Sequence, residues 1–128
     1  MRKLFTINKK EELSIIAKYL LSFENIEAIL LNGEMGSGKT TLTTYLAKEM
    51  GIQQTIISPT FNGMLIYPNL VHIDAYKLRG DLEAFEDYFE DSIVVIEWPE
   101  KINHSFKHYI NVNIVMKDNN RIFEIEVI

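Results

Sequence analysis

The sequence predicts an α/β fold, in which a covered, mostly parallel central sheet is flanked by helices and extended by an antiparallel hairpin near the carboxyl terminus. Two observations predict it. Short, wholly apolar runs at 28–31 and 93–96 are typical of strands that are covered on both faces. Stretches with the helical spacing of apolar residues surround these runs, and the last twenty residues alternate between apolar and polar.

The amino-terminal elements are predicted to be an edge strand, a helix and a buried strand. Residues 3–7 suit the edge strand. Asn8 can then cap a helix, with Glu11 three residues on in the capping-box position. That helix has an apolar stripe typical of a core-facing side, formed by Leu13, Ile16, Ala17, Leu20 and Leu21. Residues 27–32 are short, aliphatic and followed by glycine, as expected for a buried strand.

The middle of the chain is predicted to alternate between helices and strands. A helix is expected over 39–50, with Leu42, Tyr45 and Leu46 inward and Gly51 as its left-handed stop. Strands are expected at 55–57, 70–74 and 93–96, and a short helix is expected to carry Leu82, Phe85 and Phe89 on one face.

The carboxyl-terminal residues predict a hairpin with one face in water. Its apolar positions are Ile110, Val112, Ile114 and Met116 before the turn at 117–120, and Phe123, Ile125 and Val127 after it.

Length and composition limit the class of protein. A chain of 128 residues can bury one sizeable core, so residues 1–128 are expected to form a single domain. A net charge of −5 argues against a protein that binds nucleic acid by broad phosphate neutralisation. The absence of cysteine excludes a disulfide scaffold and a thiolate zinc site. No apolar run is long enough for a membrane helix or a signal peptide, so a cytoplasmic protein without a membrane partner is expected.

Residues 33–40 match the phosphate-loop pattern G-x-x-x-x-G-K-[ST] at every fixed position. A predicted strand precedes the loop and a predicted helix follows it. Glycines let the backbone N–H groups turn inward around phosphate oxygens, and the helix N-terminus adds its positive end. A chance match in a chain of this length has a probability on the order of a few in a thousand. The expected phosphate-binding residues are Gly33, Glu34, Met35, Gly36, Ser37, Gly38, Lys39, Thr40 and Thr41.

The same motif predicts Mg²⁺ beside the nucleotide. Lys39 is expected to contact the β- and γ-phosphates, and the Thr40 hydroxyl to ligate Mg²⁺. Such a site needs a second acid, usually at the end of a neighbouring apolar strand. Glu97, directly after the apolar run 93–96, is the candidate. The alternative is a solvated carboxylate that closes a strand, and Trp98 beside it is interpreted as core cover.

Two further segments carry polar groups of interest. His72, Asp74 and Tyr76 are spaced by two, so on a strand they point to one side, where they either order a water molecule or simply pack. Six acids without a base follow: Asp81, Glu83, Glu86, Asp87, Glu90 and Asp91. That run is interpreted as a solvated helix face, with a docking surface for a basic partner as the alternative.

In their order and separation, four segments resemble the TsaE (YjeE) family. They are GEMGSGKTT at 33–41, SPTF at 58–61, HIDAYKL at 72–78 and IEW at 96–98. The resemblance implies a P-loop NTPase-like fold and an ATPase needed to make threonylcarbamoyladenosine (t6A37) in tRNA. It implies the TsaB- and TsaD-type proteins of the threonylcarbamoyl-transferring complex as partners. The chain would reach tRNA through them, and ATP hydrolysis would reset the complex.

Residue roles also follow from the resemblance. Lys39 and Thr40 would serve the phosphates and Mg²⁺, Glu97 would replace the more usual Walker B aspartate, and Asp74 would organise water or metal. The catalytic set is therefore Lys39, Asp74 and Glu97. Lys77 stands where the family motif has an arginine, and Arg79 is the available substitute.

Three other functions compete with this hypothesis. Small P-loop kinases close several arginines over the phosphates, whereas this chain has three scattered ones, Arg2, Arg79 and Arg121. A GTPase would need an N-K-x-D motif, which the chain lacks. A module that binds ATP without significant hydrolysis stays open, because no arginine finger is evident. We therefore expect slow hydrolysis by the chain alone.

Overall fold

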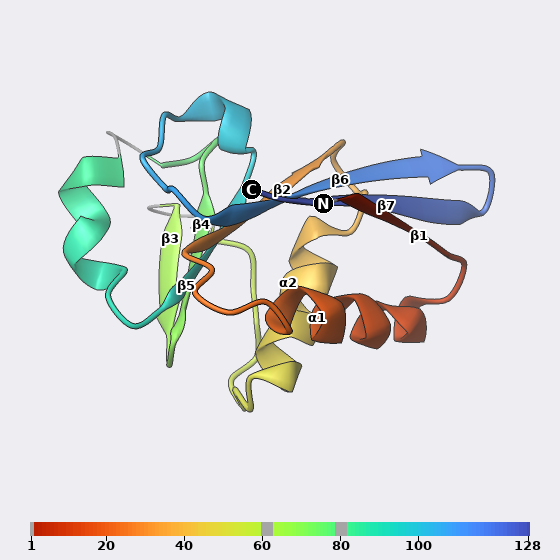
Figure 1. The fold of residues 1–128 in the computed structure, drawn as a ribbon, viewed down its shortest axis with the longest axis horizontal. Helices are drawn as coiled ribbons and strands as arrows, with labels where there is room; N and C mark the ends of the chain where they lie inside the picture. The colour runs from red at the N-terminus through yellow and green to blue at the C-terminus, as the bar shows by residue number, and fades with distance from the viewer. Residues whose placement is uncertain (1, 60–62, 79–81) are drawn as a thin grey trace.

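A computed structural model describes residues 2–59, 63–78 and 82–128 of the protein. The described residues contain one seven-stranded sheet in the order β1-β7-β6-β2-β5-β4-β3 (Figure 1). Its strands are β1 (Arg2–Ile7), β2 (Ala28–Gly33), β3 (Met64–Tyr67), β4 (Leu70–Asp74), β5 (Ile93–Glu97), β6 (Tyr109–Lys117) and β7 (Asn120–Val127). The helices are α1 (Leu13–Leu21), α2 (Lys39–Glu49) and the 3-10 turns η1 (Lys10–Glu12), η2 (Leu82–Tyr88) and η3 (Pro99–Lys101).

The centre of the sheet is parallel and its two edges are antiparallel. Strands β4, β5, β2 and β6 run in the same direction. Strand β3 pairs antiparallel with β4 at one edge, and β7 and β1 add antiparallel strands at the other. The prediction of an α/β fold with a mostly parallel sheet and an antiparallel carboxyl-terminal hairpin is confirmed. Because the central strands are parallel, their carboxyl ends meet at one edge of the sheet.

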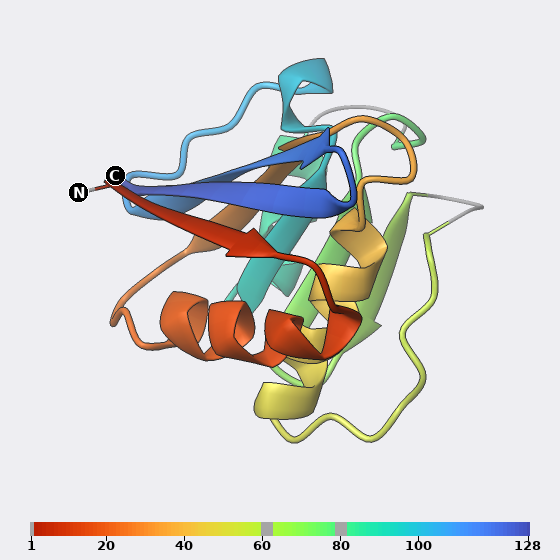
Figure 2. The ribbon, with the colours of Figure 1, turned by 90° about the vertical axis from the view of Figure 1, so that its right-hand side faces the viewer.

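The two faces of the sheet are covered differently. Helices α1 and α2 lie together on one face (Figure 2), over a core that includes the fully buried Ile16, Leu20, Ile29, Leu42, Leu46, Ile110 and Phe123. The turns η2 and η3 flank the other face, where a smaller cluster contains Val71, Ile73, Val94 and Ile96. Strands β2 and β5 are therefore covered on both sides, as their apolar sequences predict.

Most expected elements lie close to their predicted bounds. In the stripe of α1, Leu13, Ile16, Ala17 and Leu20 are buried and Leu21 is partly buried. Gly51 follows α2 with a φ of +80°. In the hairpin, Ile110, Val112, Ile114, Phe123 and Ile125 are buried, whereas Met116 near its tip is exposed. No helix in the described parts of the chain has the length and apolarity to cross a membrane.

Three local predictions are wrong. The acid that closes the capping box is Glu12, not Glu11, because the helix enters through η1 and Glu12 Oε1 accepts from the Lys9 N–H at 3.1 Å. Residues 55–57 form a loop that joins no strand of the sheet, in which Ile56 packs partly buried against the core, and β3 is the strand beside β4. The segment with Leu82 and Phe85 is a 3-10 turn, and Phe89 follows its end.

Candidate nucleotide-binding site

The loop between β2 and α2 adopts the conformation that its glycines allow. Gly36 and Gly38 have φ angles of +81° and +108°, a region that other residues rarely enter. At Gly33 the constraint is space, because an added Cβ would lie 2.6 Å from Ser37 Oγ and 3.1 Å from the Ile114 carbonyl oxygen. Gly38 precedes the first residue of α2, so the loop ends at a helix N-terminus.

The side chain of Lys39 folds back across this loop. Its Nζ donates to the Gly33 carbonyl oxygen at 2.8 Å and lies 3.4 Å from the centroid of the Trp98 ring. Burial lowers the pKa of Lys39, although the charges of Glu97, Glu100 and Asp74 oppose this shift. The loop thus holds a poorly hydrated ammonium group close to its backbone. Trp98 packs against the smaller core cluster, as the interpretation of it as core cover predicts. It is also a partner of Lys39, which the sequence did not indicate.

Glu97 connects the loop to the strands beside it. Its Oε2 accepts from Thr40 Oγ1 at 2.9 Å and from His72 Nε2 at 2.6 Å. Burial acts to raise the pKa of Glu97, but the hydrogen bonds from His72 and Thr40 outweigh it and keep the pKa below its usual value. The two predicted metal-binding residues, Thr40 and Glu97, are therefore in direct contact, and the carboxylate is ionised.

Asp74 lies beside Glu97 in the register of β4 and β5. Its Oδ1 accepts from the Tyr76 N–H at 3.0 Å. Burial raises the pKa of Asp74, and the charge of Glu97 adds to the effect. Two buried carboxyl groups at neighbouring strand ends repel each other and attract a cation.

The predicted trio of His72, Asp74 and Tyr76 is only partly brought together. His72 is fully buried and bonds to Glu97, with Asp74 two residues on in the same strand. Tyr76 lies beyond the end of β4, where it is 64% exposed and packs edge-on against Trp98 at 5.7 Å between ring centroids. Tyr76 does not point to the same side as His72 and Asp74, because β4 ends at Asp74 and the alternation of side chains along a strand ends with it.

The remaining predicted phosphate-binding residues follow the loop. Glu34 and Met35 are exposed on its outer side, Ser37 is buried, and Thr41 lies in the first turn of α2. Part of the SPTF segment (60–61) and Arg79 lie outside the described residues. Among those that are described, no cluster of three or more histidine, cysteine or acidic side chains has the arrangement of a metal site by itself.

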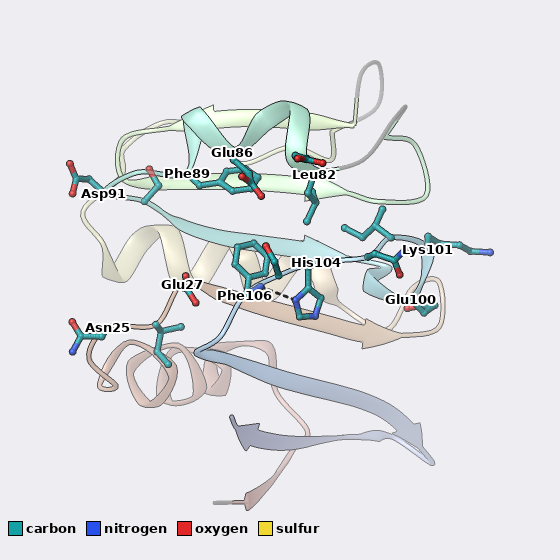
Figure 3. A pocket seen from close by; sticks show the side chains of 16 residues that line it. Asn25, Glu27, Leu82, Glu86, Phe89, Asp91, Glu100, Lys101, His104 and Phe106 are labelled. Carbon is teal, nitrogen blue, oxygen red and sulfur yellow. Dashed lines mark hydrogen bonds between the residues drawn. The ribbon is translucent and has the colours of Figure 1, made fainter.

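A groove of about 1120 Å³ lies away from the loop (Figure 3). It runs between η2, η3 and residues 102–106, with Phe89 and Phe106 inside and Glu27, Glu83 and Glu86 among its acidic lining. Three members of the predicted acidic run, Glu83, Glu86 and Asp91, line it. No residue of 33–41 does, so the groove is separate from the loop.

Comparison with known proteins identifies the family. A model of the family described as "Threonylcarbamoyl adenosine biosynthesis protein TsaE" matches residues 7–123. The chain belongs to the TsaE family. The TsaE protein of Rickettsia prowazekii is 35% identical over 91% of this chain and 88% of its own length. That of Streptomyces coelicolor is 40% identical over 58% of this chain and 57% of its own length.

The structural comparison agrees with this assignment at the level of the fold. The crystal structure of YdiB from Bacillus subtilis superimposes with a TM-score of 0.76 at 24% identity, over 98% of this chain and 84% of that one. The fold is therefore P-loop NTPase-like, as the resemblance implied. Membership of TsaE connects the chain to the biosynthesis of threonylcarbamoyladenosine in tRNA.

Proposed function

We propose that this TsaE-family chain binds Mg·ATP in the loop 33–41 and hydrolyses it slowly, as the accessory ATPase of the t6A37 modification machinery. The observation that carries the proposal is the contact between the loop and β5: Thr40 Oγ1 lies 2.9 Å from Glu97 Oε2, directly beside a buried Lys39. A threonine and an ionised carboxylate in contact at the start of a helix are the usual protein contribution to a magnesium–nucleotide site.

The residues of the loop fit a polyphosphate. The Lys39 ammonium, held at the Gly33 carbonyl, exchanges that neutral acceptor for anionic oxygens. Ser37 Oγ is buried without a hydrogen-bond partner in the described structure, so it is free to donate to a ligand. The backbone N–H groups at the start of α2 add the positive end of the helix.

Thr40 and Glu97 are the residues proposed to hold Mg²⁺, which when bound neutralises charge on the β- and γ-phosphates. Mg²⁺ in nucleotide sites is usually held by one or two protein oxygens together with phosphate oxygens and water, which is the number of ligands that Thr40 and Glu97 could provide. The 2.6 Å hydrogen bond from His72 Nε2 holds the Glu97 carboxylate in its orientation. Asp74, at the neighbouring strand end, is proposed to orient the attacking water.

Slow turnover is expected because no described arginine contacts Glu97. Of the two arginines among the described residues, Arg2 bonds to Glu124 and Arg121 lies next to Gly38. An arginine on the transferred phosphate contributes several orders of magnitude in rate. We infer that the partners, proteins of the TsaB and TsaD type, provide the missing stabilisation, and that hydrolysis resets their complex. Residues 1–128 would act as one cytoplasmic domain that meets tRNA only through these partners.

The alternative is a module that uses ATP as a conformational ligand without significant hydrolysis. The lack of an arginine at Glu97 within the described parts of the chain also favours it. It has the same binding site, so only a rate measurement separates the two functions. A small kinase has less support, because it would need several arginines that close over the phosphates, and among the described arginines only Arg121 lies near the loop.

Single-turnover hydrolysis of radiolabelled ATP, with and without the partner proteins, tests the proposal. We expect a rate below about one per minute for the chain alone and at least a tenfold increase with the partners. Lys39→Ala with the partners is the control and should stay at background. No hydrolysis under either condition would favour the module, and phosphoryl transfer to a small acceptor would overturn both.

A further inference from the structure

Arg121 reaches the phosphate loop from the opposite side to Glu97. It is the second residue of β7, paired in register with Met116 of β6 and with Ile7 of β1. Its Nε lies 3.8 Å, and its Cδ 3.9 Å, from the position that a Cβ on Gly38 would occupy. The side chain therefore extends from the hairpin to the residue that precedes α2.

The charge of Arg121 is not compensated within the described residues. Arg2, the other described arginine, bonds to Glu124 at 2.6 Å, whereas Arg121 has no acid within salt-bridge distance among those residues. It lies beside a further positive feature, the N-terminus of α2. An unpaired guanidinium next to a helix N-terminus favours the binding of an anion.

A second observation at the same loop also points to a ligand. Ser37, adjacent to Gly38, is 1% exposed, and its Oγ has no hydrogen-bond partner in the described structure. A buried hydroxyl without a partner is costly in a protein interior. Next to Gly38, the loop thus has a buried hydroxyl without an acceptor in Ser37 and a guanidinium without an ion-pair partner in Arg121.

The order of the strands indicates which end of a nucleotide Arg121 meets. Strands β5 and β6 flank β2 on opposite sides. Glu97 and Thr40, which we assign to the metal and hence to the β- and γ-phosphates, lie on the β5 side. Because a polyphosphate is a linear chain, its remainder extends away from the metal, toward the side where β6 and β7 lie.

We propose that Arg121 binds the nucleotide at its α-phosphate end, so that it contributes to the affinity for ATP and ADP alike. This inference rests on the proposed function, since it takes the loop as the nucleotide site. It makes Arg121 a binding residue that acts equally in the ground state and the transition state. Such a residue changes KM and leaves the rate at saturating substrate in place.

Titration calorimetry of Arg121→Ala with Mg·ATP and with Mg·ADP tests the proposal. We expect both dissociation constants to rise about tenfold and Arg121→Lys to recover part of the loss, since the ammonium keeps the charge but not the planar fork. The matched control is Arg2→Ala, which removes an exposed arginine at the far end of the β1–β7 pair. In single-turnover hydrolysis, the loss should appear in KM.

Two results would overturn the inference: unchanged affinity for both nucleotides, or a loss confined to ATP, which would assign Arg121 to the γ-phosphate. Lys39→Ala separates this failure from that of the proposed function. If the wild type binds Mg·ATP, Lys39→Ala does not, and Arg121→Ala binds as the wild type does, only the role of Arg121 is wrong. If the wild type itself binds no nucleotide, the proposed function fails first.

Discussion

Glu97 and Asp74 are neighbours across β5 and β4, yet their pKa values shift in opposite directions. Burial acts to raise both, but only Glu97 accepts hydrogen bonds from His72 and Thr40, which bring its pKa below the usual value. At the scale of single residues, the site therefore contains one firmly ionised carboxylate and one that holds its proton more readily. Two acids with separated pKa values suit different tasks, such as holding a metal and orienting water.

Asp74→Asn should stabilise the free protein at neutral pH. At pH values well below 3.8, the usual pKa of an aspartate, the Asp74 carboxyl is neutral in both the folded and the unfolded protein. Its ionisation then has no effect on the free energy of unfolding. As the pH rises through the raised pKa of the folded protein, the wild type loses stability that the asparagine variant keeps. Thermal melts from pH 4 to 8 measure this.

The difference in melting temperature should therefore grow with pH. Asp87→Asn, at an exposed position of η2, is the control and should change stability by no more than about 0.5 kcal/mol. A variant less stable than the wild type at pH 7.5 would show that the Asp74 carboxylate is structural.

Glu97→Gln and Glu97→Ala should separate charge from hydrogen bonding. The glutamine keeps an acceptor for Thr40 and His72 but removes the negative charge, so affinity for ATP should fall about tenfold in Mg²⁺ and change little in EDTA. The alanine also leaves the buried His72 Nε2 without an acceptor, which should cost a further 1–3 kcal/mol or so of folding stability. Calorimetry and denaturant unfolding measure the two effects. Equal losses of affinity with and without Mg²⁺ would make Glu97 a structural residue only.

At the scale of elements, the hairpin β6–β7 is part of the core and carries Arg121 to the loop. Phe123 of β7 is fully buried, opposite Ile114 of β6 and Phe5 of β1. Phe123→Ala should lower the free energy of unfolding by about 3–5 kcal/mol because it leaves a cavity beneath α1. The control is Val115→Ala in β6, at a position 56% exposed. Denaturant unfolding measures both; a cost under about 1 kcal/mol for Phe123 would mean that the hairpin packs only loosely.

Elements with a strong local signal were predictable from the sequence. Burial determines which positions are apolar, so the pattern of residue types indicates it directly. This holds for the apolar runs of β2 and β5, the stripe of α1 and the alternation of the hairpin. The wrong predictions concern places where two segments could occupy the same position in the sheet. Residues 55–57 have a strand-like composition, but β3 takes the edge position, and nothing in the local sequence at 64–67 indicates which segment pairs with β4.

At the scale of the whole molecule, the sheet gathers a site from distant parts of the chain. The motif and its predicted partner Glu97 could be predicted because the spacing of the loop and the strand after it is characteristic. The contacts of Glu97 with His72, of Lys39 with Trp98 and of Gly38 with Arg121 could not, since each depends on the strand order. The groove of Figure 3 could not be predicted from the sequence either, although Glu83, Glu86 and Asp91 of its lining belong to the acidic run.

Calorimetric titration of Mg·ATP into wild type and Lys39→Ala tests most directly whether Mg·ATP binds in the loop 33–41 through Lys39. Truncation removes a buried ammonium group that no water can replace, so affinity should fall at least a hundredfold. The far-ultraviolet circular dichroism spectrum should stay that of the wild type. Equal affinity of the two proteins for Mg·ATP would show that the loop 33–41 is not the nucleotide site.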